Sequence, residues 1–186
     1  MCWNADLCHG SFKCRSHDDI WVSGNLGSAA LGLAHLQGKL TLPDAMSALC
    51  LKALHQPQPR VQLGLALLGI AHSCIDISDG LMGDLGHIVR ASNLGAVIEL
   101  ASIPCLPQFQ QSLHLPLYQQ AILAGGDDYE LCFSAPVTQR STIQALSNTL
   151  KLPLTRIGHM TKGDAVRVQF QGQTLPIIKE GFDHFG

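Results

Sequence analysis

Charge is scarce in this sequence. Only 14% of its 186 residues are Asp, Glu, Lys or Arg, the formal net charge is −2, and no run of basic residues occurs. Nucleic-acid binding depends on clustered Lys and Arg, so the composition argues against a nucleic-acid partner. Aromatic residues are also few, at 5%, whereas 46% of the residues are hydrophobic. These proportions are typical of one globular domain with a substantial core.

Long hydrophobic runs are missing as well. The longest apolar stretch, VQLGLALLGIA at 61–71, is too short to cross a bilayer. The first ten residues, MCWNADLCHG, lack the basic and then apolar regions of a signal peptide. We therefore expect a cytoplasmic protein with no membrane partner.

The seven cysteines include no CxxC pair. Four of them lie in apolar contexts and are expected to be reduced core residues: Cys50, Cys74, Cys105 and Cys132. The first seventeen residues hold a second group of potential ligands: Cys2, Cys8, His9, Cys14 and His17. Without a CxxC pair, a poorly ordered leader is favoured there, and a zinc site remains the alternative.

Helix and strand patterns alternate irregularly along the chain. Helical patterns cover 24–38, 42–56, 61–71, 79–92 and 137–150, and prolines break 103–126 into short helices. Strand patterns cover 18–24, 72–78, 95–100, 128–136, 154–161 and 165–172. Because strict βαβ alternation is absent, we expect an α+β fold, with a mixed β-sheet and helices packed on its faces.

The stretch CIDISDGLMGDLGHI (74–88) places two carboxylates where a strand passes into a helix. The amides at a helix start attract phosphate, but Asp76 and Asp79 would repel it. Both features are compatible if Mg²⁺ stands between the carboxylates and a phosphate, with Ser78 contacting the phosphate or a metal-bound water. The simpler interpretation is that Ser and Asp are ordinary helix-capping residues.

Further along the same helix, Asp84 and His87 are three residues apart and share a face. A metal pair is conceivable, but a local hydrogen bond between the two side chains is the favoured prediction.

The stretch AGGDDYEL (124–131) places two glycines before two carboxylates and a strand. Glycines allow tight turns and close approach of a ligand. Asp127 or Asp128 would face the same crevice as Asp76 if the fold brings the two loops together. Taken alone, the stretch is equally typical of a solvated turn.

Other candidate features are weaker. Gly24 and Gly27 precede a helix, but SGNLGSAALG matches neither GxGxxG nor a Walker loop. Phe182, in the terminal GFDHFG, either stacks on a ring or fills the core. No G-x-S-x-G elbow occurs and no cysteine has the surroundings of a nucleophile.

A resemblance to a known family is carried by four runs in a fixed order: SGNLGSAALGLA, PQPR before an apolar helix, IDISDGLMGDLGHI and GGDDYELCF. GFDHF near the end is a fifth. From about Asp18 onward the chain resembles the thiamine-monophosphate kinase family of the aminoimidazole-ribonucleotide-synthetase-related superfamily. The third and fourth runs are specific, because sister families carry a Thr-containing run in place of DISDG.

The resemblance implies direct, Mg²⁺-dependent transfer of the γ-phosphate of ATP to thiamine monophosphate, which gives thiamine diphosphate and ADP. It implies that Asp76 and Asp79 bind Mg²⁺ and that Ser78 contacts ATP. It also implies that Asp127 and Phe182 contact the substrate, and that homodimers are the usual assembly of the family.

The resemblance also implies an organisation. Residues 18–186 correspond to the C-terminal domain of the family, and residues 1–17 form an unmatched leader. Nothing in the chain resembles the acid-rich N-terminal domain of the family, which holds much of the Mg²⁺–ATP. We therefore expect the C-terminal part of such a kinase, as a truncated or frame-shifted reading of a longer gene would produce, with little or no kinase activity alone.

Three positions depart from the family pattern. Asp127 replaces a usual Glu and is one methylene shorter, Gln56 replaces an Arg, and Ser28 replaces an acid. Two alternatives stay open on the sequence: a sister ATP-dependent synthetase of the same superfamily, and a non-catalytic binding module that keeps the fold.

Overall fold

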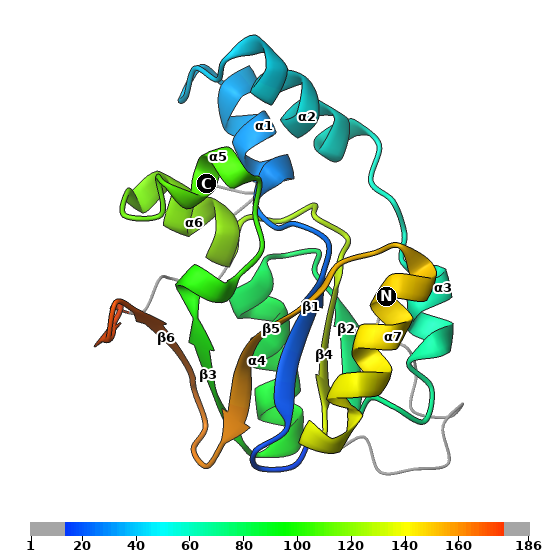
Figure 1. Ribbon diagram of the computed structural model, residues 1–186. Helices are drawn as coiled ribbons and strands as arrows, with labels where there is room; N and C mark the ends of the chain where they lie inside the picture. Colours follow the sequence, from blue (N-terminus) through cyan, green and yellow to red (C-terminus); the bar gives the residue numbers. More distant parts are fainter. Residues whose placement is uncertain (1–13, 177–186) are drawn as a thin grey trace.

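A seven-stranded sheet with helices on both faces forms the computed structural model, which describes residues 14–176 (Figure 1). The strands are β1 (Asp19–Ser23), β2 (Ser73–Asp76), β3 (Gly95–Glu99), β4 (Leu131–Ala135), β5 (Leu154–Thr161), β6 (Val166–Phe170) and β7 (Gln173–Thr174). The α-helices are α1 (Ser28–Leu36), α2 (Asp44–His55), α3 (Val61–Ala66), α4 (Leu81–Ser92), α5 (Pro107–Gln110), α6 (Pro116–Ala124) and α7 (Arg140–Leu150). Two short 3-10 turns are η2 (Leu100–Ser102) and η3 (Val137–Gln139).

The strand order is β2-β4-β1-β5-β3-β6-β7. β3 and β6 pair in parallel, and the remaining neighbours pair antiparallel. The prediction of an α+β fold with a mixed sheet is therefore confirmed. The prolines at 107 and 116 stand at the starts of α5 and α6, as expected for a residue that fits a first helical turn.

The sheet separates two hydrophobic clusters. Along β1, Ile20 and Val22 pack into one cluster with Leu85 of α4, whereas Trp21 packs into the other. Trp21 stacks on Phe133 of β4, with ring centroids 6.4 Å apart and an interplanar angle of 8°. Figure 1 shows α4 behind the central strands and α7 in front of them. Strands covered on both faces are hydrophobic at nearly every position, as β1 and β4 are.

The helix expected over 61–71 is shorter and more exposed than the apolar run predicted. α3 ends at Ala66, and Gly69 follows with φ +77°. Leu63 and Leu67 are buried against the sheet, whereas Leu65 is 53% exposed and Leu68 is 57% exposed. A helix that lies on one face of a sheet buries one stripe only, so an all-apolar sequence leaves the opposite stripe in solvent.

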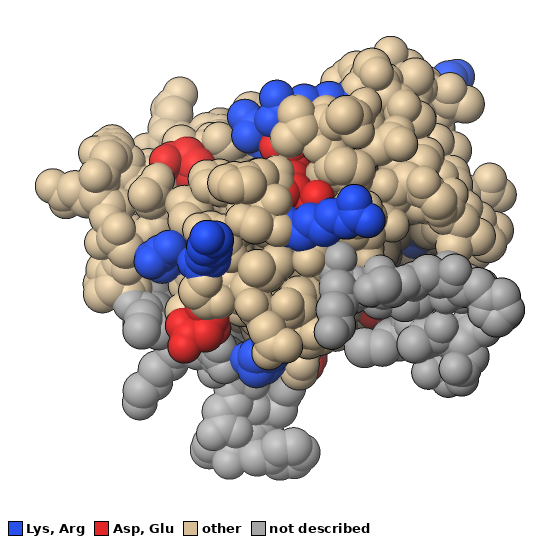
Figure 2. Space-filling view, turned by 90° about the horizontal axis from the view of Figure 1, so that it is seen from below, with Lys and Arg blue, Asp and Glu red and all other residues tan. Residues whose placement is uncertain are grey.

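Ion pairs fasten the lower ends of the strands. The buried carboxylate of Asp19 accepts bonds from Nε and Nη2 of Arg140, at 2.6 and 2.8 Å, and Arg156 lies 3.6 Å away. Seen from below, acidic and basic side chains stand next to one another instead of gathering by sign (Figure 2). In the described part of the chain, no helix has the length and apolar character needed to cross a membrane.

Candidate metal and nucleotide site

The two acidic loops selected from the sequence lie side by side. The amide of Asp127 donates to the carbonyl of Ser78 at 3.0 Å, and the amide of Tyr129 donates to that of Ile77 at 2.9 Å. The amide of Ile77 in turn donates to the carbonyl of Glu130 at 2.8 Å. The fold therefore meets the condition under which residues 76–79 and 127–130 can act together.

Negative charge accumulates at this junction. Asp76 is the last residue of β2 and is half-buried, Ser78 is half-buried, and Asp79 is exposed. The charge of Asp127 is the main reason that the pKa of the Tyr129 hydroxyl is raised, and Asp76 and Asp79 add to it. Four acidic or phenolic groups therefore lie within electrostatic reach of one another.

Asp84 fills the amides at the start of this helix. Its Oδ2 accepts the N–H of Ser78 at 3.0 Å and the N–H of Asp79 at 3.2 Å. Burial raises the pKa of the Asp84 carboxyl, the two amide bonds oppose that rise, and the charges of Asp79 and Asp76 add to it. A phosphate cannot use these amides while Asp84 holds them.

The predicted hydrogen bond between Asp84 and His87 is wrong. Asp84 is 4% exposed and bonds backward to the loop, whereas His87 is exposed and places Nδ1 3.3 Å from Arg90 Nη2. A carboxylate in a first helical turn gains more from unpaired amides than from a solvated imidazole on the same face.

Asp128 closes the second candidate anion seat, at the start of α1. Its Oδ2 accepts the N–H of Gly27 at 2.8 Å, and Ala29 provides a further amide bond. The loop SGNLGSAALG is therefore capped by a carboxylate of the chain itself. Burial raises the pKa of Asp128 to about 8, the Gly27 amide opposes this rise, and the charge of Glu130 adds to it.

This pKa predicts a pH-dependent stability. The folded pKa of Asp128, about 8, lies above its ordinary value of 3.8. The stabilising contribution of the protonated carboxyl is thus complete below the lower value and is lost as the pH rises toward the upper one. Asp128→Asn keeps an oxygen for the Gly27 amide but cannot ionise. We expect its stability to gain on that of the wild type across this window, by up to about 1.4 kcal/mol per pH unit.

Urea unfolding followed by circular dichroism at several pH values, with EDTA present, measures this difference. Parallel stability curves for the two proteins across the window would contradict the assignment.

A buried ion pair that the sequence analysis missed supports the junction. Glu130 is 5% exposed and accepts bonds from Nε and Nη2 of Arg60, at 2.7 and 2.6 Å. Ser23 also donates to Glu130, and a side chain at Gly24 would collide with its carboxyl group. The available signal was the arginine of PQPR, the one cation in an otherwise uncharged break between two helices.

Glycines permit the close approach of the two loops. A Cβ at Gly126 would lie 2.5 Å from the carbonyl oxygen of Ser78. Gly80 has φ +108°, and a Cβ there would lie 2.7 Å from the backbone of Ala124. At these two positions the spacing between the loops excludes any larger residue.

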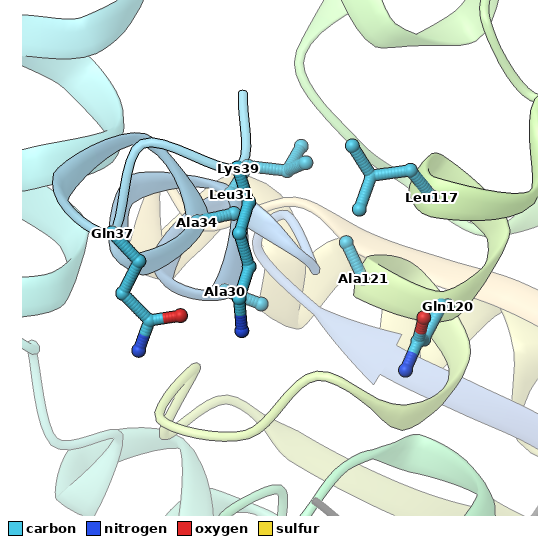
Figure 3. Close-up of a pocket in the computed structure, with 8 residues that line it drawn as sticks. All are labelled: Ala30, Leu31, Ala34, Gln37, Lys39, Leu117, Gln120 and Ala121. Carbon is cyan, nitrogen blue, oxygen red and sulfur yellow. The ribbon is translucent and has the colours of Figure 1, made fainter. Parts of the chain in front are cut away.

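A small pocket of about 110 Å³ lies between α1 and α6, near the same junction (Figure 3). Leu31 of α1 and Leu117 of α6 are among its apolar lining residues, and Gln37, Lys39 and Gln120 add polar groups. Figure 3 shows the residues of α1 and its following turn on one side, and those of α6 on the other. The pocket contains none of the candidate acids, so the charged junction lies outside it.

The four cysteines expected in the core are free thiols, three of them buried and Cys74 half-buried. Burial raises the pKa of Cys74 to about 12, and the charge of Asp76 adds to this. Such a thiol stays protonated, in agreement with the expectation that no cysteine acts as a nucleophile.

The predictions for the two ends of the chain are tested only in small part. Phe182 lies outside the described residues, as do Cys2, Cys8 and His9. Cys14 is buried, donates to Ser73 Oγ at 3.1 Å and accepts from Ser134 Oγ at the same distance. These bonds give Cys14 a place in the core without a metal.

The donor set at the junction suits a metal shared with a ligand. Within residues 14–176, no group of three or more His, Cys, Asp or Glu side chains is arranged to hold a metal ion. Protein-bound Mg²⁺ in nucleotide enzymes usually takes one or two carboxylates and completes its shell with water and phosphate. Asp76 and Asp79 fit that role and do not fit a metal held by the described residues alone.

The family follows from the comparison with known sequences. A family model described as "AIR synthase related protein, C-terminal domain" matches residues 15–171. The chain belongs to this family, and the resemblance noted from the sequence is confirmed.

Individual relatives are similar over most of this chain. Thiamine-monophosphate kinase of Escherichia coli (strain K12) is 41% identical over 171 residues, which cover 90% of this chain and 52% of that protein. The crystal structure of thiamine-monophosphate kinase from Stenotrophomonas maltophilia K279a matches with a TM-score of 0.76 and 40% identity, over 88% of this chain and 52% of that one.

A third comparison extends the likeness in fold. AaThiL, solved in complex with AMPPCP and TMP, matches with a TM-score of 0.73 at 24% identity, over 95% of this chain and 54% of that one. At that identity the match shows the fold alone. The chain spans about half the length of the curated relatives it matches.

Proposed function

We propose that this chain is the C-terminal domain of a thiamine-monophosphate kinase. The reaction transfers the γ-phosphate of ATP to thiamine monophosphate and gives thiamine diphosphate and ADP. The observation that carries the proposal is the junction at which Asp76 and Asp79 meet the Asp127 turn while the adjacent amides are filled by Asp84. A phosphate that approaches this junction finds carboxylates instead of free amides, and a divalent cation is then required to bind it.

The roles of the residues follow from their positions. Asp76 and Asp79 hold Mg²⁺, and Ser78, between them, contacts ATP. Mg²⁺ bound there supplies positive charge that offsets the charge on the transferring phosphate. Asp127, on the facing turn, contacts the substrate, and Phe182 packs against its thiamine end. Direct phosphoryl transfer depends on positioning and charge neutralisation, so no nucleophile of the chain is needed.

The proposal has a domain organisation and a setting. Residues 18–186 form the C-terminal domain and residues 1–17 a leader. The enzyme acts in the cytoplasm, where ATP is available, and assembles as a homodimer. Because Asp76 and Asp79 supply only part of a metal shell, we expect the 186-residue chain alone to show little or no turnover.

A non-catalytic binding module is the second candidate function. It is favoured by one observation: no cluster of three or more potential ligands holds a metal within the described part of the chain. Such a module would keep the fold and bind phosphorylated ligands without transferring phosphate.

Titration calorimetry with thiamine monophosphate tests the proposal. We expect weak binding in Mg²⁺, no detectable binding in EDTA, and weaker binding of unphosphorylated thiamine, because the phosphate reaches the protein through the metal. Binding of equal strength in EDTA, or no binding of any thiamine compound, would contradict the proposed function. Binding in Mg²⁺ without turnover, also after addition of the N-terminal half of the Escherichia coli relative, would favour the binding module.

A further inference from the structure

Asp84 is the one buried acid that contacts the metal-binding loop through its main chain. It lies in the first turn of α4, is 4% exposed, and bonds the amides of Ser78 and Asp79 through the same oxygen, Oδ2. A carboxylate so enclosed would be costly unless it formed such bonds. The two amides, in turn, belong to the short connection between β2 and α4.

The opposite side of this connection is fixed by the facing turn. The carbonyl of Ser78 accepts the amide of Asp127 at 3.0 Å, and Gly126 leaves no room for a Cβ beside that carbonyl. The loop is therefore gripped on two sides: by main chain from the 126–129 turn and by one side chain from α4. Of these, only the Asp84 contact can be removed by a substitution that leaves the facing turn intact.

We propose that Asp84 is a positioning residue that fixes the main chain of Ser78 and Asp79, so that the carboxylates of Asp76 and Asp79 are held in place to bind a divalent cation. This inference rests on the proposed function, since it assigns Asp84 to the same site. Groups that orient metal ligands without touching the metal commonly change metal affinity about 10- to 100-fold when they are removed.

Two other roles of Asp84 make different predictions. If Asp84 acted only through its negative charge, every neutral substitution would weaken metal binding alike. If it only stabilised the fold, any equally destabilising substitution elsewhere would have the same effect. Positioning instead requires an acceptor oxygen at this place, whether or not it carries a charge.

The experiment is a Mn²⁺ titration of the chain, followed by paramagnetic broadening of its backbone amide signals in NMR spectra. Asp84→Ala removes the acceptor, and Asp84→Asn keeps an oxygen without the charge. Asp84→Glu keeps the charge but displaces the oxygen by one methylene, and remains informative if Asp84→Ala does not fold. Ile143→Ala, in the buried face of α7 on the other side of the sheet, is the control for lost stability.

The expected result is a loss of Mn²⁺ affinity of about tenfold or more in Asp84→Ala and Asp84→Glu, and a change within about threefold in Asp84→Asn. Faster hydrogen exchange of the Ser78 and Asp79 amides should accompany the loss, and Ile143→Ala should retain wild-type affinity. Equal losses in Asp84→Asn and Asp84→Ala, or unchanged affinity in Asp84→Glu, would overturn the positioning role.

Asp76→Asn separates this inference from the function on which it rests. If Asp76→Asn abolishes Mn²⁺ broadening but the Asp84 variants do not weaken it, the positioning role alone is wrong. If Asp76→Asn leaves the broadening near residues 76–79 unchanged, the proposed metal site is wrong and the role of Asp84 falls with it.

Discussion

Replacement of both Asp76 and Asp79 by asparagine is expected to reduce Mg²⁺-dependent ATP binding about 100-fold or more. Each lost contact between a charged oxygen and a cation-bound phosphate group costs about 1.5–3 kcal/mol, and two are lost together. The amides nearby cannot substitute for them, because Asp84 and Asp128 already occupy the helix starts. Calorimetric titration of ATP in Mg²⁺ measures the effect.

A variant with the same change in charge provides the control. Asp44 and Asp164 are exposed acids in the first turn of α2 and in the β5–β6 turn. We expect Asp44→Asn with Asp164→Asn to bind ATP as the wild type does. If both double variants weaken ATP binding equally, the effect is one of net charge, and the assignment of Asp76 and Asp79 as ligands is wrong.

The second large effect is on stability. Arg60→Met leaves the carboxylate of Glu130 buried without its bidentate partner, which is expected to lower the free energy of unfolding by about 3 kcal/mol. Such a loss is a large fraction of the total stability of a domain. Because Glu130 also binds Ser23 and lies next to Asp128, the loss should reach both β1 and the start of α1. Urea unfolding followed by circular dichroism gives the value.

Arg140→Met is the matched control for this prediction. Arg140 also makes a bidentate contact with a buried acid, but it is half-exposed, and Asp19 retains Arg156 as a second partner. Its replacement should therefore cost clearly less. The double variant Arg60→Met with Glu130→Leu should recover much of the lost stability, since no buried charge remains unpaired. Equal losses in Arg60→Met and Arg140→Met would contradict the account of Glu130.

Local sequence patterns were sufficient to predict the fold class and the main elements. The strand before Asp76 and the helix after Gly80 follow from period and composition, and both are found close to the expected bounds. The strand of 128–136 is shorter, and β4 begins at Leu131, because Asp127 and Tyr129 adopt positive φ values of 66° and 50°. Such conformations depend on the neighbouring loop and leave no mark in a pattern of alternation.

The contacts that define the site were less accessible to sequence reasoning. Asp128 reaches the amide of Gly27 across 101 positions of sequence, and Glu130 reaches Arg60 across 70. Only the order of strands in the sheet brings these segments together, and that order is not encoded in any local period. Asp84 is different, since it lies only five and six residues from its partners. A carboxylate in a first helical turn, after a loop with unpaired amides, was the available signal.

The most direct test of the central claim is anomalous scattering from Mn²⁺ in crystals of the chain grown with Mn²⁺ and a non-hydrolysable ATP analogue. The account predicts a peak within about 2.0–2.2 Å of carboxylate oxygens of Asp76 or Asp79, bridging to phosphate oxygens of the analogue. Phosphate groups bound directly to main-chain amides of this loop, with the metal elsewhere, would contradict it.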